Sequence, residues 1–278
     1  MEKLTPLLHR EGISIIKEIP TDGHTPLKVL GDDYNQYVVK ALKNSHDKNS
    51  LINEFLGYYF LRLWDIPTPE VAVVSIDPEL ISQTEGLSVR HKPFLYENIC
   101  FGSQWIENSI ELEAFISLDK FKRELNNPED FFRLALFDIW IANEDRNPGN
   151  NNLLLCPDGE KLITITAIDH AFILASGGYD YLMPEELMFS YNESILHHQA
   201  CRTLKRKIKA DIIWMDKARE SFYLCIEECR QHFDEICGYI PDGLEFTPEE
   251  QQNIHAFLFS EVRNKKVFEE YSLILSKM

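Results

Sequence analysis

Basic residues are scarce relative to acidic ones in this sequence. There are 28 Lys and Arg against 45 Asp and Glu, which gives a formal net charge of −17 at pH 7. Proteins that bind nucleic acids need clustered basic charge to contact phosphates, so this balance argues against a nucleic-acid partner. A nucleotide ligand remains compatible with it, because a few local cations and a metal ion can neutralise a triphosphate.

Long apolar runs are missing as well. No stretch approaches the roughly 18 residues that a membrane-spanning helix requires. The first residues, Met1 to Pro6, contain no apolar signal core. We therefore expect a cytoplasmic protein without a membrane span. The composition, 44% hydrophobic and 26% charged, is that of an ordinary folded protein and rules out a disordered chain.

The six cysteines include no Cys-x-x-Cys pair and no accompanying His-rich segment. This spacing is not typical of a structural zinc site. We expect buried free thiols, which fits a reducing compartment.

The first hundred residues predict a β-rich unit with one long helix. Apolar residues at three- and four-residue spacing predict a helix over 49–64. A turn at Gly31–Asp33 joins two short β runs into a hairpin. We expect Phe101 to Trp105 to be a connector. Strands are expected at 13–19, 27–30, 37–41 and 70–76, with one or two more within 89–99.

The remainder of the chain predicts helices. Residues 131–142 are almost all apolar, which is typical of a buried helix. This helix contains Asp138, a carboxylate that will need a polar partner. A β-rich front and a helical back predict a two-lobed α+β protein, divided into residues 1–100 and 101–278. Further helical periodicity is found over 194–201, 208–233 and 248–275.

The densest group of polar side chains lies between two apolar segments. The buried helix runs into a loop rich in Asn and Asp, residues 143–152, and an apolar strand leaves that loop. A second apolar strand, 162–168, then leads to Asp169 and His170. Ordered loops on rigid scaffolds often carry catalytic residues, so we take this segment as the candidate site.

The order and spacing of these residues suit phosphoryl transfer. That reaction needs a carboxylate to orient the attacking hydroxyl, and an Asn or Asp five residues later to hold a metal ion. It also needs a second metal-binding Asp at the end of a neighbouring strand. Asp145, Asn150 and Asp169 meet this pattern, and their oxygen ligands suit Mg²⁺ rather than zinc.

The loop sequence N-E-D-R-N-P-G-N-N-N-L, followed by I-D-H, resembles the catalytic loop and metal-binding Asp of HipA-like kinases. It is also similar to the D-R-H-x-x-N loop of phosphatidylinositol kinases. The resemblance implies a two-lobed protein-kinase-like fold with a β-rich N-lobe and a helical C-lobe. It further implies a kinase that uses ATP and Mg²⁺ to transfer the γ-phosphoryl group to a hydroxyl. The first expectation for the acceptor is a Ser or Thr of a protein.

The same resemblance extends to the front of the chain. Lys40, on a strand, looks like the ATP-binding lysine, and Glu54, on the following helix, looks like its ion-pair partner. Residues 21–26, T-D-G-H-T-P, resemble a short phosphate-binding loop, with an ordinary strand connector as the alternative. The nucleotide-contacting residues of that loop would be Gly23, His24 and Thr25.

Some positions depart from the family pattern. Asn147 stands where many relatives have His, Gly149 stands where HipA has Lys, and His170 is not followed by Gly in an Asp-Phe-Gly motif. Arg146 is a catalytic candidate that either contacts the transferred phosphoryl group or pairs with Asp138. Two other functions stay open: a kinase for a small-molecule or lipid acceptor, and a nucleotide-binding regulatory module with little turnover.

Overall fold

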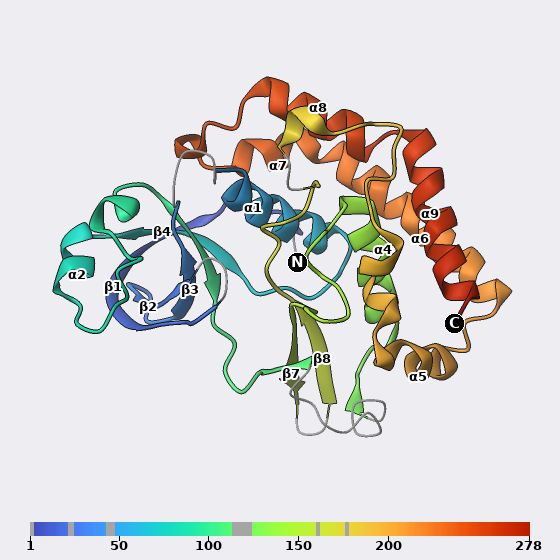
Figure 1. The fold of residues 1–278 in the computed structure, drawn as a ribbon, viewed down its shortest axis with the longest axis horizontal. Helices are drawn as coiled ribbons and strands as arrows, with labels where there is room; N and C mark the ends of the chain where they lie inside the picture. Colours follow the sequence, from blue (N-terminus) through green and yellow to red (C-terminus); the bar gives the residue numbers. More distant parts are fainter. Residues whose placement is uncertain (1–2, 22–24, 43–47, 113–123, 160–161, 176–177) are drawn as a thin grey trace.

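The structure, a computed structural model, describes residues 3–21, 25–42, 48–112, 124–159, 162–175 and 178–278. Figure 1 shows the strands of the first hundred residues gathered on one side and the C-terminal helices on the other, with helix α1 (Lys48–Leu63) between them. The expected α+β class is therefore confirmed.

Five strands close into a barrel in the order β1-β2-β3-β5-β4. β1 pairs in parallel with β4, and the other pairs are antiparallel. Because side chains alternate along a strand, Val39 points into the barrel core and Lys40 points out of it. Lys40 is paired with Phe101, whose ring packs against Phe55 of α1. The strands are β1 (Leu8–Glu18), β2 (Leu27–Gly31), β3 (Gln36–Lys40), β4 (Val71–Ile76) and β5 (Cys100–Gln104).

The fifth strand corrects two expectations. We expected strands within 89–99, but this segment holds turns and the short 3₁₀ helix η1 (Pro93–Tyr96). The expected connector at 101–105 is mostly strand β5. Gly102 allows this strand to pack closely, because a Cβ there would lie 2.3 Å from Val74 Cγ2 of β4.

The long helical patterns divide at capping residues. The 248–275 pattern is two helices, because Ser260 interrupts the first and caps the second by accepting from Arg263 N. The 194–201 pattern is also broken, into the 3₁₀ helix η5 (Ile195–His197) and the start of α5. The helices are α2 (Pro78–Gln83), α4 (Glu129–Ile141), α5 (Gln199–Ile208), α6 (Ile212–Gln231), α7 (Phe233–Tyr239), α8 (Pro248–Leu258) and α9 (Glu261–Ser276). Short 3₁₀ turns are η3 (Tyr179–Tyr181), η4 (Tyr191–Glu193) and η6 (Asp242–Leu244).

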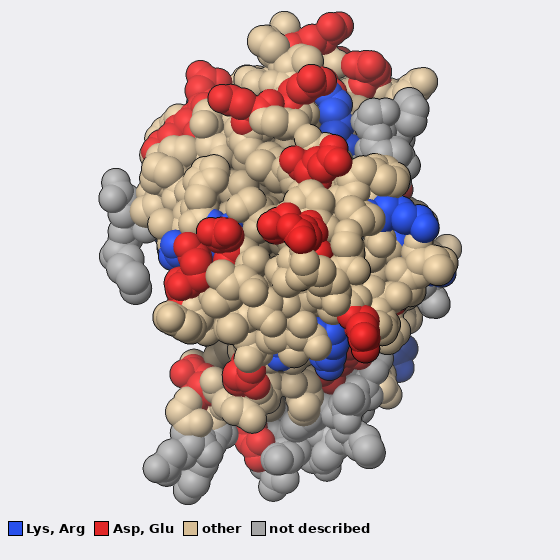
Figure 2. All heavy atoms as spheres, turned by 90° about the vertical axis from the view of Figure 1, so that its left-hand side faces the viewer, with Lys and Arg blue, Asp and Glu red and all other residues tan. Residues whose placement is uncertain are grey.

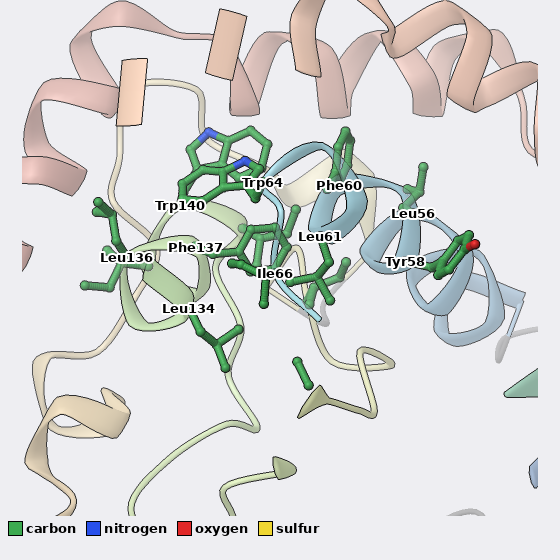
Figure 3. Packing of buried hydrophobic residues seen from close by; sticks show 14 of the residues in the cluster. Leu56, Tyr58, Phe60, Leu61, Trp64, Ile66, Leu134, Leu136, Phe137 and Trp140 are labelled. Carbon is green, nitrogen blue, oxygen red and sulfur yellow. The ribbon is translucent and has the colours of Figure 1, made fainter. Parts of the chain in front are cut away.

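Large aromatic side chains fix α1 against α4. The rings of Trp64 and Trp140 stack with centroids 5.3 Å apart, and Phe60 meets Trp140 edge-on at 5.5 Å. Figure 3 shows the two indoles side by side between the helices. Such pairs add directional preference to apolar burial. They hold the two helices that carry Glu54 and Asp138 in one relative position.

A small sheet places two polar segments side by side. It consists of β6 (Ile110–Glu111), β7 (Leu153–Asp158) and β8 (Leu162–Ala167), with β7 in the middle. The β7–β8 pairing continues beyond the strands, because Ile168 N donates to Asn152 O at 3.1 Å. The end of the polar loop therefore lies next to the residue that precedes Asp169.

The surface reflects the acidic composition. Figure 2, which looks at the barrel side, shows acidic side chains scattered over the face with fewer basic ones among them. All six cysteines are free, and all but Cys225 are buried. Within the described residues, no helix has the length and apolar character needed to cross a membrane.

Candidate functional site

Lys40 lies between two carboxylates at the end of strand β3. Its Nζ is 2.5 Å from Glu54 Oε1 and 2.8 Å from Asp169 Oδ2. The side chains of Lys40 and Glu54 are 8% and 2% exposed, whereas Asp169 is 35% exposed. The expected contact between Lys40 and Glu54 is present, and Asp169 joins it at the open side.

Opposite charges keep this buried group ionised. Burial alone would lower the pKa of Lys40, but the carboxylates of Asp169 and Glu54 outweigh it and raise the pKa above its usual value. Burial alone would likewise raise the pKa of Glu54, but the Lys40 ammonium and His170 bring the pKa below its usual value. The site thus contains a fixed cation beside a partly exposed carboxylate.

Helix α1 holds the segment that follows Asp169. Glu54 Oε2 accepts from the backbone N of His170 at 2.9 Å. The neighbouring Asn53 donates from Nδ2 to Ala171 O and to Ile173 O, both at 2.9 Å. Two successive side chains of one helix therefore fix the path of this segment.

Two asparagines orient the carboxylate of Asp145. Asn150 Nδ2 donates to Asp145 Oδ1 and Asn152 Nδ2 donates to Asp145 Oδ2, each at 2.8 Å. Asn150 uses only its amide nitrogen in this contact, so its carboxamide oxygen stays available as an acceptor. Asn152 is the last of three consecutive asparagines, and its hydrogen bond fits the turn and hydrogen-bonding role expected of such loop residues.

Asn147 shapes the turn between Asp145 and Asn150. Its Oδ1 accepts from Gly149 N at 2.9 Å and from Asn150 N at 3.0 Å. Its Nδ2 donates to Asp145 O at 3.1 Å. Asn side chains commonly stabilise turns through such bonds to the following backbone. The position where many relatives have His thus has a structural purpose in this chain.

Asp138 has the partners that its burial demanded. Arg146 Nη1 donates to Asp138 Oδ1 at 2.5 Å, and Asn143 Nδ2 donates to the same oxygen at 3.0 Å. Burial raises the pKa of Asp138 to about 6, and the Arg146 guanidinium opposes that rise. The pair fastens the loop to helix α4.

Of the two roles expected for Arg146, the structure shows the pairing with Asp138. Its side chain is 0% exposed, and its Nη2 donates to Ile168 O at 2.9 Å. A guanidinium enclosed in this way has no surface to offer a phosphate. We therefore correct the catalytic candidacy of Arg146: it braces the loop that carries Asp145.

The expected phosphate loop is described only in part. Gly23 and His24 lie outside the described residues. Thr25 is buried and has a φ of 49°, and its Oγ1 accepts from Arg90 Nη1 at 3.0 Å. Its role in binding a nucleotide stays a prediction.

The oxygen donors of the site suit a hard cation. No group of three or more His, Cys, Asp or Glu side chains within the described part of the chain is placed to hold a metal ion. Mg²⁺ does not need one, since it usually keeps several waters and binds one or two carboxylates together with substrate phosphates. The carboxylate of Asp169 and the carboxamide oxygen of Asn150 are oxygen ligands of the kind that Mg²⁺ prefers.

Comparison with known proteins identifies the family. Residues 13–270 match the family described as HipA-like kinase, and the chain belongs to it. Among solved structures, the chain is similar to the Helicobacter pylori proinflammatory kinase CtkA, with a TM-score of 0.53 and 12% sequence identity. This similarity covers 98% of the present chain and 100% of CtkA, and it concerns the fold. A comparison with curated proteins gives no match.

Proposed function

We propose that the protein is a kinase that uses ATP and Mg²⁺ to phosphorylate a hydroxyl group. The observation that carries the proposal is the contact of Lys40 with both Glu54 and Asp169, next to a loop that orients Asp145. Membership of the HipA-like kinase family supports the same reaction. We also propose the two-lobed arrangement of protein kinases, with the division after Gln104 rather than at residue 100, because β5 completes the barrel.

Each residue of the site then has a task. Lys40, held by Glu54, would contact the phosphates of ATP, and Asn150 and Asp169 would hold Mg²⁺. The bound metal ion would neutralise negative charge on those phosphates. The two carboxylate oxygens of Asp145 are fixed by amides. Asp145 would accept a hydrogen bond from the acceptor hydroxyl and so orient the hydroxyl oxygen toward the γ-phosphorus.

The acceptor is proposed to be a Ser or Thr of a protein, following the family resemblance. A small-molecule or lipid hydroxyl is the alternative on the same fold. A regulatory module without turnover has less support, because the side chains of Asn147 and His170, which depart from the family pattern, have defined contacts in the site. The cytoplasmic location predicted from the sequence stays a prediction.

Two measurements test this proposal. ATP labelled at the γ-phosphate is incubated with the protein, Mg²⁺ and candidate protein, lipid or small-molecule acceptors, and label transfer is followed. Thermal unfolding with and without Mg²⁺ and ATP measures binding separately. Transfer that disappears in Asp169→Asn supports the kinase. Binding without transfer to any acceptor supports the regulatory module, and absence of both rejects the proposal.

A further inference from the structure

His170 contacts two parts of the site that lie far apart in the sequence. The side chain is 4% exposed. Its Nε2 is 3.1 Å from Arg146 Nη2 in the polar loop, and its Nδ1 is 3.8 Å from Glu54 Oε2 on helix α1. Its backbone N also donates to Glu54 Oε2, at 2.9 Å. The imidazole therefore lies between the loop brace and the partner of Lys40.

The chemistry of arginine fixes the tautomer of this imidazole. A guanidinium has only donors, so the Nε2 of His170 must accept from Arg146 Nη2. A ring nitrogen that accepts carries no proton, which places the single proton of the neutral ring on Nδ1. That N–H faces the carboxylate of Glu54. His170 thus presents an acceptor to the loop and a donor to helix α1.

These contacts make one continuous polar chain through the site. It starts at helix α4, passes through the loop and the segment after β8, crosses to helix α1 and strand β3, and returns to the segment after β8 at Asp169. Because each member is buried or half-buried, a displacement of one changes the position of the next. The members in order are Asp138, Arg146, His170, Glu54, Lys40 and Asp169.

Helix α1 approaches His170 more closely than a side chain would allow. A Cβ at Gly57, which lies one turn after Glu54, would be 2.6 Å from His170 Cβ and 2.8 Å from His170 Cγ. Real Cβ contacts are not that short, so any larger residue would push the helix and the imidazole apart. Glycine is unfavourable inside a helix, and this close approach gives a reason for its presence.

We propose that His170 is a positioning residue of the kinase, which aligns the two halves of its catalytic apparatus. Through Arg146 it is linked to the loop that orients Asp145, and through Glu54 it is linked to Lys40. Seated against Gly57, it sets the distance between helix α1 and the loop. This inference rests on the proposed function, and its tests include one that does not depend on turnover.

The first test compares His170→Ala with His170→Gln. Steady-state kinetics give kcat and the KM for ATP of each variant. Because the ring contacts charged partners, its removal should lower kcat by about 10-fold or more. The KM for ATP should stay within about 3-fold, since His170 holds other residues rather than phosphate. Glutamine has both an acceptor and a donor, so His170→Gln should recover most of the lost kcat.

The second test uses the glycine that seats the imidazole. Gly57→Ala should lower kcat as His170→Ala does, because the added methyl separates α1 from His170. Gly238→Ala is the matched control: it adds the same methyl to helix α7, where nothing beyond the adjacent residues and the helix's own backbone lies within 4 Å of the new Cβ. Gly238→Ala should keep the parent kcat. Parent-like kcat in Gly57→Ala would overturn the proposed seating.

The third test measures amide hydrogen exchange without any substrate. His170→Ala should increase exchange both in the loop around Arg146 and in helix α1, because the link between them is gone. If His170→Ala does not fold, Gly57→Ala carries the same comparison, and His170→Gln should exchange like the parent. Unchanged kcat together with unchanged exchange in these two segments overturns the inference. A parent protein that neither binds ATP nor transfers phosphate rejects the proposed function instead, while the exchange result still decides whether His170 links the segments.

Discussion

The ammonium of Lys40 lies 2.5 Å from the carboxylate of Glu54, and both side chains are buried. The contact joins a strand of the barrel to helix α1, which is itself packed on α4 through aromatic rings. A charge removed from water is stable only with a partner, so the two side chains hold one another in place. Lys40 therefore has a fixed position from which to meet a phosphate.

The first prediction concerns this cation. Lys40→Met keeps the bulk of the side chain and removes its charge, so it should lower kcat/KM for ATP at least ~100-fold, as the loss of a preorganised electrostatic contact does. The measurement is transfer of labelled γ-phosphate. Lys205→Met is the control, because Lys205 on α5 donates to Leu275 O in the helical part of the molecule. Equal losses in both variants would mean that Lys40 has no special role.

Local sequence patterns predicted most of the fold. Two short β runs joined by the turn at Gly31–Asp33 indicated the hairpin, and apolar spacing indicated helix α1, because both signals are local in the sequence. Strand β5 was missed, since Gly102 owes its place to a contact with Val74 of another strand. The division of the last helix at Ser260 was hidden by apolar periodicity that continues across the cap.

The residues of the candidate site likewise fall into those that a local pattern predicts and those that depend on contacts between distant segments. The spacing of Asp145 and Asn150 is visible in the sequence because both lie in one short loop. Asp138 was expected to need a partner, since a carboxylate inside an apolar helix must have one. The tasks of His170 and Gly57 depend on the approach of two segments that are distant in the chain, and no local pattern records that approach.

The second prediction separates metal binding from orientation of the acceptor. Asp169→Asn should weaken Mg²⁺-dependent ATP binding, because a neutral amide is a poorer ligand for a hard dication. Asp145→Asn should leave ATP binding almost intact and lower kcat by about 10²–10⁴-fold, the usual cost of losing general-base assistance. Calorimetry in Mg²⁺ gives the affinity, and label transfer gives kcat.

The control for this pair is Asp216→Asn, which makes the same change at an exposed position of helix α6. It should behave like the parent in both measurements. If Asp145→Asn and Asp169→Asn also behave like the parent, the two carboxylates are structural and the assigned site is wrong.

The third prediction concerns the buried pair of Asp138 and Arg146. Asp138→Ala leaves the guanidinium enclosed without its carboxylate, which should lower the free energy of unfolding by about 3–5 kcal/mol. The double variant Asp138→Leu, Arg146→Met removes both charges and should be less destabilised than Asp138→Ala alone. Both variants should lose phosphate transfer, because the loop that carries Asp145 loses its brace.

Urea unfolding gives the free energies for this comparison. A double variant that is less stable than Asp138→Ala would show that the remaining bonds of Arg146, to Ile168 O and to His170, matter more than its pairing with Asp138.

The last prediction concerns pH and Glu54. Burial alone would raise the pKa of this carboxyl, but the Lys40 ammonium and His170 bring the pKa below its usual 4.5. A carboxyl with a lowered pKa in the folded state stabilises the fold above its unfolded pKa, and that contribution is lost as the pH falls below it.

The parent should therefore exceed Glu54→Gln in unfolding free energy by a constant amount between pH 5.5 and 8. Below about pH 4.5 the difference should shrink by at most ~1.4 kcal/mol per pH unit. Urea unfolding of both proteins from pH 3.5 to 8 measures it, with Glu220→Gln on the exposed face of α6 as the control. A difference that grows as the pH falls would mean that Glu54 is held protonated in the fold, and the ion pair with Lys40 would then have to be abandoned.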